Sequence, residues 1–191
     1  MSRHIWVQGT RRLAASIAIA ALAACTGAGS GENAAQAQDP AALNDLEVAH
    51  AAYVAGNIDI RNAHLALALS DNAEVREFAD LMLRDHQAVN EAALALLDKL
   101  KAQPQDNGFS QTLIEGAEVK LGEMAKLSGP AFDKSYAENE LAYHQTVNHV
   151  VGDAFIPNVE NEELKALLGQ ALATFQAHEE HARQMVAQLG Q

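Results

Sequence analysis

Cysteine, proline and aromatic residues are all scarce in this sequence. Cys25 is the only cysteine among 191 residues, so no intrachain disulfide can form and no Cys-x-x-Cys redox motif exists. The chain also lacks a phosphate-binding glycine loop and the Gly-x-Ser-x-Gly turn of serine hydrolases. Enzyme classes that depend on these motifs receive no support, and the sequence by itself does not indicate an enzyme.

Basic residues are few as well. The chain has 13 lysines and arginines against 25 aspartates and glutamates, and its formal net charge is −12. Three arginines lie in the first 25 residues, before the first acidic residue, Glu32; removing these three from 13 leaves 10 basic residues against the same 25 acids, a net charge of −15. A surface of this sign repels phosphate backbones, so nucleic acid is not an expected partner.

The apolar residues that are present favour helices. Hydrophobic residues make up 49% of the chain but aromatics only 5%, and alanine and leucine dominate the apolar set. Chains rich in alanine and leucine and poor in β-branched residues suit helices better than sheets. We therefore predict an all-α fold.

The first 25 residues resemble an export signal. Arginines precede "LAASIAIAALAA" at 13–24, an apolar run that is too short to span a membrane, which takes about 20 residues. The run ends in Leu-Ala-Ala-Cys at 22–25, which resembles the lipobox of bacterial lipoproteins, whose cysteine is lipidated. An ordinary secretory signal or, from Thr-Arg-Arg at 10–12, a twin-arginine signal remain alternatives.

These features predict three parts. Residues 1–25 are the signal peptide, with Cys25 retained as the lipidated first residue of the mature chain. Residues 26–39, small and polar, form a flexible tether, and 40–191 form the folded domain. The expected partner at this end is the membrane, through the lipid at Cys25. Thr26 in place of aspartate favours the outer membrane, so the resemblance implies a bacterial envelope lipoprotein facing the periplasm.

Four segments of the remaining chain repeat apolar residues at spacings of three and four, which is typical of one helix face. They cover about 40–69, 71–103, 130–157 and 161–189. Their expected inward faces are Leu43, Leu46, His50, Tyr53, Asn57, Ile60, His64 and Leu67; Phe78, Met82, Asp85, Val89, Leu96 and Leu100; Phe132, Tyr136, Glu140, Tyr143, Val147, Val151 and Phe155; and Leu164, Leu168, Ala171, Phe175, His178, Ala182, Met185 and Leu189. Four stripes of similar length bury one another best as a four-helix bundle.

The connections between these segments differ in length. The first and second segments, and the third and fourth, are joined by a few residues, so each pair is expected to form an antiparallel hairpin. Residues 103–130 link the two hairpins and contain a short helical pattern. Two hairpins joined by one long crossover are the ferritin-like arrangement.

Three stretches carry a family resemblance: "VREFADLMLRDHQAVN" at 75–90, "LSGPAFDKSYAENELAYHQ" at 127–145 and "LATFQAHEEHARQM" at 172–185. Together they resemble the bacterial domain-of-unknown-function 4142 family, whose members are exported helical proteins with an expected ferritin-like bundle. The resemblance implies characteristic polar positions at Asp59, Asp85, His86, His144 and His178. The chain departs from the family pattern at Asp59, usually glutamate, and at Ala173, often proline. The family implies no settled activity.

Hairpin geometry suggests that these polar residues meet. Residues equally far from the turn of an antiparallel pair share a layer, so position 178 faces about position 139 and position 59 faces about position 82. Glu140 and His178 are therefore expected to be neighbours, with His144 one turn away. Position 59 is expected one turn from Asp85 and His86.

Imidazoles together with carboxylates suit iron, manganese, zinc or copper. The candidate metal ligands are Asp59, Asp85, His86, Glu140, His144 and His178. A ferritin-type di-iron site needs Glu-x-x-His on two helices, but Leu83 and Phe175 occupy the positions three before His86 and His178. A standard di-iron oxidase is therefore not expected.

Two interpretations of the polar layer remain open. In one, the protein is a lipid-anchored structural or binding module, in which buried histidines pair with carboxylates and specify the fold. In the other, it is a transition-metal protein that stores or senses metal or performs redox chemistry under stress. In both, His178 points inward and His181 lies at the rim of the bundle.

Overall fold

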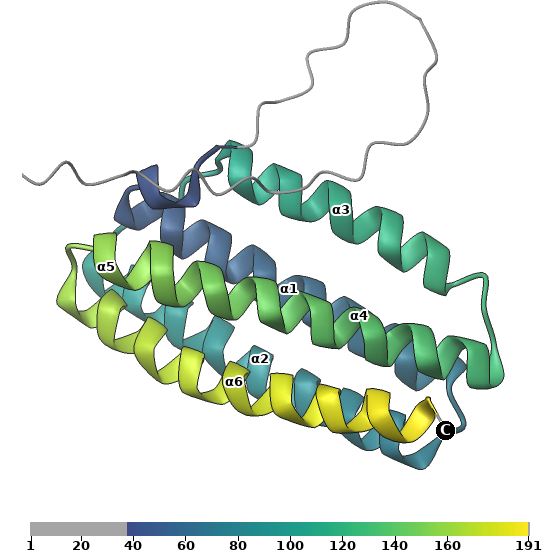
Figure 1. The fold of residues 1–191 in the computed structure, drawn as a ribbon. Helices are drawn as coiled ribbons and strands as arrows, with labels where there is room; N and C mark the ends of the chain where they lie inside the picture. Colours follow the sequence, from purple (N-terminus) through teal and green to yellow (C-terminus); the bar gives the residue numbers. More distant parts are fainter. Residues whose placement is uncertain (1–37, 191) are drawn as a thin grey trace, which may run out of the picture. The chain divides into compact units, whose positions relative to one another are not determined.

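The computed structural model describes residues 38–190, and this part of the chain is helical without strands (Figure 1). The predicted all-α class is confirmed for these residues. The long helices are α1 (Asp45–Leu69), α2 (Ala73–Leu100), α4 (Gly129–Val150) and α6 (Glu162–Leu189), with α3 (Gly108–Met124) between α2 and α4. The predicted signal peptide, Cys25 and nearly all of the predicted tether lie outside the described residues.

Asparagine side chains start four of these helices. Asn44, Asn72, Asn107 and Asn161 each accept a hydrogen bond from a backbone N–H of the first turn, which satisfies a donor that has no partner within the helix. Asn44 forms a capping box with Glu47. The prediction that the first helix begins at Pro40 is wrong, because residues 40–42 form a separate 3-10 turn, η1 (Pro40–Ala42), and the chain is extended again at Asn44.

The long helices pack in pairs. α1 packs mainly against α2 across the short turn at 70–72, and α4 packs mainly against α6. α2 also contacts α6, and α1 contacts α4, so the four surround a common interior (Figure 1). α3 runs along the outside of α1 and connects the two pairs. Within the described residues, no helix is both long and apolar enough to cross a bilayer.

The end of α4 departs from regular geometry. The sequence predicts an unbroken helix to Pro157, but residues Val151–Phe155 form a π-helical segment, η2, followed by the short α5 (Ile156–Asn158). The N–H of Ile156 donates to the Val151 carbonyl, five residues back. Pro157 has no N–H to donate, so the regular ladder cannot continue through it. The backbone is therefore wider next to the core residues Val151 and Phe155.

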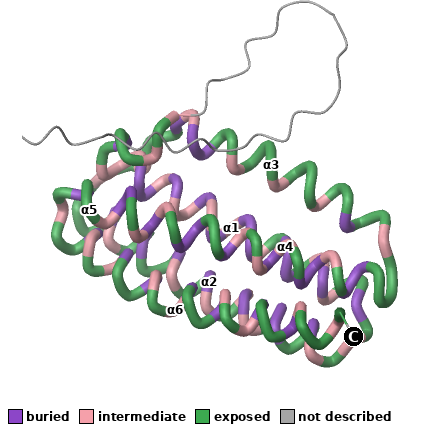
Figure 2. The backbone as a smooth tube through the Cα atoms, viewed as in Figure 1, coloured by how far each residue is buried: buried purple, intermediate pink, exposed green. Residues whose placement is uncertain are grey.

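Two apolar clusters make up the core. One contains Phe155, Leu168 and Phe175, and the other contains Phe78 and Met185. On each long helix, residues of one cluster give way to residues of the other partway along, and the buried faces run the length of the bundle (Figure 2). On every one of these helices, buried polar residues lie between the residues of one cluster and those of the other.

The predicted inward faces of α4 and α6 are confirmed: every residue of both stripes is buried except Tyr143 and Leu189, which are half-buried. The predicted face of α1 is wrong by part of a turn. His64 is exposed and Tyr53 is half-buried, whereas Ile58, Asp59 and Asn62 are buried. α1 is rich in alanine and has α2, α3 and α4 around it, so its sequence pattern marks no single face.

Candidate metal centre

The polar residues predicted to converge do so in the middle of the core. α1 supplies Asp59, α2 supplies His86, α4 supplies Glu140 and His144, and α6 supplies His178, each at most 2% exposed. One ring nitrogen from each of the three histidines lies within 4.8 Å of the others, and one atom each of Asp59, Glu140 and His144 forms a second such group. We call these five residues the polar layer.

Counting residues from the two hairpin turns located the facing residues to within about one helical turn. The ring centroids of His178 and His144 are 5.4 Å apart, so His178 faces His144, which this count placed one turn away. His86 lies with its Nε2 3.5 Å from Asp59 Oδ2. Packed helices cross at an angle and can be staggered, so counting residues from a turn cannot locate a partner more closely than this.

Asp85, the sixth predicted ligand, lies at the edge of the polar layer and contacts His178 from outside. His178 Nε2 is 3.0 Å from Asp85 Oδ2. Burial tends to raise the pKa of Asp85, but hydrogen bonds from Arg84 and His178 outweigh it and lower that pKa below its usual value. The carboxylate is therefore ionised and can only accept, so the Nε2–H of His178 donates to it. This leaves the lone pair of His178 on Nδ1.

His144 is oriented in the same way by the backbone. Its Nδ1 is 2.9 Å from the Glu140 carbonyl oxygen, and a carbonyl accepts, so Nδ1 carries the proton and Nε2 carries the lone pair. Burial lowers the pKa of His144 to about 4, and burial also lowers the pKa of His178 below its usual value. Both rings are thus neutral near pH 7, with one free lone pair each.

His86 is the most isolated ring of the three. It stacks on Phe175, with ring centroids 4.7 Å apart and planes 9° apart, and neither of its nitrogens has a hydrogen-bond partner. Burial, followed by the proximity of His144 and His178, lowers the pKa of His86 well below its usual value. His86 is therefore also a neutral ring.

The two buried carboxyl groups form a pair. Burial and the nearby charge of Glu140 raise the pKa of Asp59 well above its usual value. Burial raises the pKa of Glu140 to about 7, although hydrogen bonds from Asp59 and Asn62 act in the opposite direction. Asn62 Nδ2 donates to Glu140 Oε1 at 3.2 Å. Two carboxyls this close cannot both ionise easily, so they share a proton and carry about one negative charge between them.

Four ring nitrogens in the polar layer have no hydrogen-bond partner: both nitrogens of His86, Nε2 of His144 and Nδ1 of His178. A buried polar atom without a partner costs roughly 1–3 kcal/mol, and most such atoms in native proteins are satisfied. One nitrogen of each ring lies within 4.8 Å of the other two, and each neutral ring offers one lone pair. With about one negative charge beside them, these rings form an arrangement suited to a cation. The residues present therefore fit a transition metal.

Sequence reasoning missed two residues that shape this layer. Asn62 holds Glu140, and Phe175 covers His86. Phe175 was assigned to the core, but its contact with the polar layer was not foreseen. Tyr136 was expected to flank Glu140 and to hydrogen-bond with it; its hydroxyl does lie close to the carboxyl pair but is buried without a hydrogen-bond partner. Asn62, a buried amide one turn from Asp59, could have been found only if the inward face of α1 had been known.

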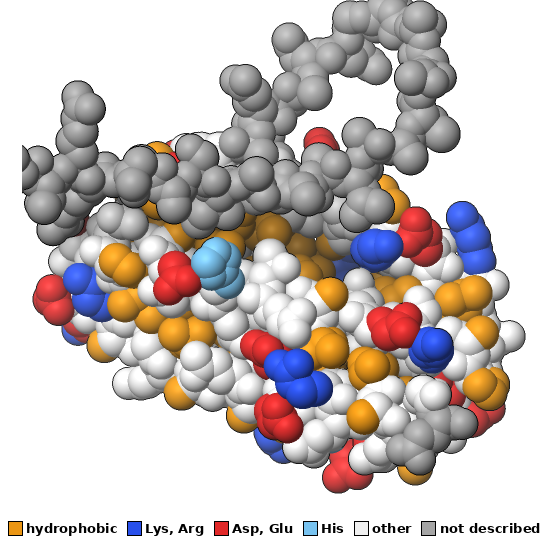
Figure 3. Space-filling view, in the orientation of Figure 1, with side chains coloured by type: hydrophobic (Ala, Val, Ile, Leu, Met, Phe, Trp, Pro, Cys, Tyr) orange, Lys and Arg blue, Asp and Glu red, His pale blue; other side chains and the backbone are white. Residues whose placement is uncertain are grey.

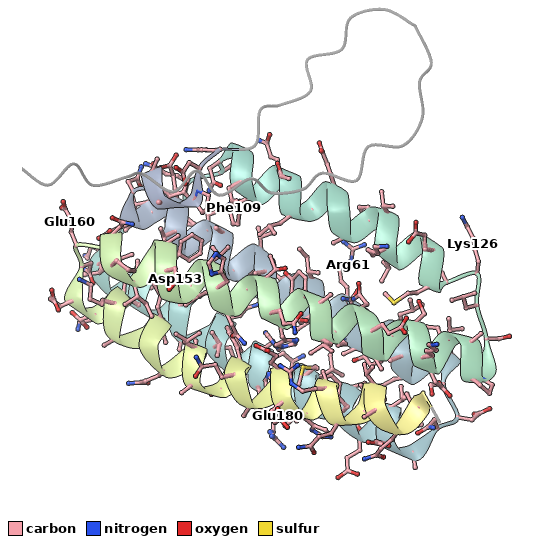
Figure 4. The ribbon with its side chains drawn as sticks, in the orientation of Figure 1. Arg61, Phe109, Lys126, Asp153, Glu160 and Glu180 are labelled. Atoms are coloured by element: carbon pink, nitrogen blue, oxygen red, sulfur yellow. The ribbon has the colours of Figure 1, made fainter. Side chains whose placement is uncertain are left out.

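The other histidines among residues 38–190 lie outside the polar layer. His181, expected at the rim, is half-buried with its ring 5.0 Å from that of Phe78. His149 is exposed and pairs with Asp153, which is labelled in Figure 4. On the face drawn in Figure 3, acidic and basic side chains are interspersed and form no broad basic area.

Comparison with known proteins adds a family and no activity. No curated protein and no solved structure matches the chain. One family profile, described as Domain of unknown function (DUF4142), matches residues 30–185, which include every residue of the polar layer. The chain therefore belongs to the DUF4142 family, as the stretches at 75–90, 127–145 and 172–185 had suggested.

Proposed function

We propose that this protein binds one transition-metal ion in its polar layer. The ligands are His86, His144 through Nε2 and His178 through Nδ1, with a carboxylate from Asp59 or Glu140 as the fourth. The observation that carries the proposal is a set of buried ring nitrogens without hydrogen-bond partners, on three histidines that each bring one nitrogen within 4.8 Å of the others. A metal ion would satisfy one nitrogen of each ring at once.

The tautomers argue for one ion and against two. A second site made of Asp59, Glu140 and His144 would compete for the same imidazole. His144 has only one free nitrogen, because its Nδ1–H donates to the Glu140 carbonyl. A single ion coordinated by three neutral imidazoles and one carboxylate matches the preferences of zinc, iron, copper or manganese. The bound ion would supply positive charge, and with iron, copper or manganese also redox capacity.

Residues around the ligands support this role. Asp85 holds Nε2 of His178, and the Glu140 carbonyl holds Nδ1 of His144. Histidines that bind metals usually donate their other N–H to a carboxylate or carbonyl, which orients the ring and raises its basicity. Asp85 is therefore assigned an orienting role in place of the ligand role that the sequence suggested.

The competing interpretation is a purely structural polar layer. The bonds from Asn62 to Glu140 and from His178 to Asp85 do link helices, as a layer that specifies packing would. In such a layer every buried polar atom is expected to have a hydrogen-bond partner, since a layer with unpartnered atoms lowers the stability of the fold more than an apolar core would. The unpartnered nitrogens are the feature that separates the two interpretations.

Metal analysis tests the proposal directly. The protein is purified without chelators, and its metal content is measured by mass spectrometry and, after metal removal, by titration calorimetry with Zn²⁺, Mn²⁺, Fe²⁺ and Cu²⁺. We expect about one equivalent per chain, lost in His144→Ala. His149→Ala, which removes an exposed histidine from the same helix, should bind normally. A folded wild-type protein that binds none of these ions would leave the structural interpretation.

We also propose the setting of this function. The Leu-Ala-Ala-Cys run at 22–25 supports a lipid anchor at Cys25 in the bacterial envelope, with the domain facing the periplasm. The two helix pairs joined through α3 support a ferritin-like bundle. Labelling cells with radioactive palmitate should mark the wild-type protein and not Cys25→Ala; equal label in both would remove the anchor from the proposal.

A further inference from the structure

An apolar cavity lies beside the polar layer, within the first core cluster. It measures about 40 Å³ and its lining is almost wholly apolar. Residues from all the long helices and from α3 contribute, among them Ala51, Ala93, Val147, Leu168 and Ala171. Phe109, labelled in Figure 4, reaches it from the first turn of α3.

The chain forms this cavity with two local features. The first is alanine on facing helices: Ala51 on α1, Ala93 on α2 and Ala171 on α6 are buried with small side chains where larger ones would fill the space. The second is the π-helical segment, whose Val151 and Phe155 form part of the wall. π-Helical turns widen a helix locally and occur often at functional sites.

Phe175 separates the cavity from the polar layer. Its side chain lines the cavity, and its ring stacks on His86 with the centroids 4.7 Å apart. The same ring lies 6.0 Å from that of His178 and 6.4 Å from that of His144. A molecule in the cavity would therefore be one aromatic ring away from all three imidazoles.

We propose that this cavity binds a small non-polar molecule of the size and polarity of dioxygen and holds it next to the metal centre. Roughly 10–15 Å³ of such volume admits one water-sized molecule, so the space fits about one or two diatomic molecules and no acyl chain. Water is not favoured there, since it needs two to four polar partners and apolar cavities stay dry while binding non-polar guests. Binding of the small molecule in the cavity does not depend on metal binding. Only a role of that molecule at the metal rests on the proposed function.

Oxygen-dependent NMR relaxation tests the proposal in solution. The metal-free protein carries ¹³C-labelled alanine methyl groups and is placed under oxygen pressure. The methyls of Ala93 and Ala171, which are 7% and 4% exposed, should relax severalfold faster than those of Ala63 and Ala182, which are fully buried in the second core cluster away from the cavity. Equal enhancement in both sets would overturn the proposal, as would a cavity filled by water or by a co-purified acyl chain.

A filling variant checks the location. Ala171→Val should remove the enhancement at Ala93, whereas Ala173→Val, the same change at an exposed position of α6, should leave it intact. If Ala171→Val does not fold, Ala93→Val with detection at Ala171 replaces it. Loss of the enhancement in Ala173→Val would contradict the assignment. The metal-free readout is independent of metal binding, so failure of the proposed function would not change it.

Discussion

Each histidine of the polar layer depends on what holds its other nitrogen. Asp85 takes the Nε2–H of His178 and the Glu140 carbonyl takes the Nδ1–H of His144, and these two bonds leave one free lone pair on each ring. Removing a hydrogen-bonded partner of this kind typically weakens metal binding 10- to 100-fold. The residues outside the ligand set are therefore as open to test as the ligands.

Asp85→Asn should weaken metal affinity by about 10- to 100-fold while leaving the stoichiometry at one. The amide oxygen can still accept from His178, so the ring keeps its place, but the negative charge that raises its basicity is lost. Titration calorimetry measures the change. Asp80→Asn, an exposed carboxylate on the same helix, serves as the control, and an equal loss there would point to a general charge effect.

The buried carboxyl pair should make Glu140→Gln stabilise the metal-free protein. The pKa of Glu140 is raised to about 7 in the folded state from an ordinary value of 4.5. The folded state therefore holds a proton that the unfolded state has lost, and the stability that this proton provides disappears as the pH rises from 4.5 through 7. Glutamine needs no proton and can keep the bond from Asn62.

Urea unfolding of the metal-free wild type and Glu140→Gln at pH 4.5 and pH 7.5 measures this effect. The stability gain of the variant should grow by up to about 3 kcal/mol between the two values, since one pKa unit corresponds to about 1.4 kcal/mol. His144, with its pKa lowered to about 4, acts in the opposite direction below pH 6.5 but is present in both proteins. A stability gain of Glu140→Gln that shrinks with rising pH would refute the raised pKa of Glu140.

At the scale of helices, the effect on stability of replacing a glycine by alanine depends on the backbone conformation and the packing at that position. Gly129 begins α4 with φ at +54°, a left-handed conformation that is unfavourable for other residues. Gly169 lies inside α6, and a Cβ added there meets no atom within 4 Å. The same substitution should therefore have opposite effects at the two positions.

Gly129→Ala should destabilise the protein by about 1 kcal/mol, and Gly169→Ala should stabilise it by up to about 1 kcal/mol through helix propensity. Chemical denaturation gives both values. Neither position touches the polar layer, so metal stoichiometry should stay unchanged in both variants. Changes of the same sign would mean that the backbone of one of these helices differs from the structure described.

At the scale of the whole molecule, the polar layer links helices that are far apart in the sequence. A ligand that binds only the folded state stabilises it by about 2.7 kcal/mol at a hundredfold excess over Kd. For a domain of this size, that corresponds to a rise in Tm of about 5–10 °C. Calorimetry should show this rise in the wild type and in His149→Ala but not in His144→Ala. A rise that persists in His144→Ala would place the metal elsewhere.

The candidate site was predictable in its membership but not in its roles. The histidines and carboxylates were found in the sequence, and His178 was placed inward from the stripe of α6. Asp85 was taken for a ligand because it follows the same helical spacing as Met82 and Val89. In the fold His86 takes the inward position, about 100° further around α2, and Asp85 contacts His178 from the edge.

The sequence alone determined that the described part of the chain is helical, that α1 ends near Leu69 and α6 begins after Asn161, and which faces of α4 and α6 are buried, because capping residues and apolar periodicity act within a few residues of chain. Only the tertiary structure decided the rotation of α1 and α2, the tautomers of His144 and His178, and the cavity behind Phe175. These depend on contacts between helices distant in sequence, and no local pattern records how one helix is rotated against another.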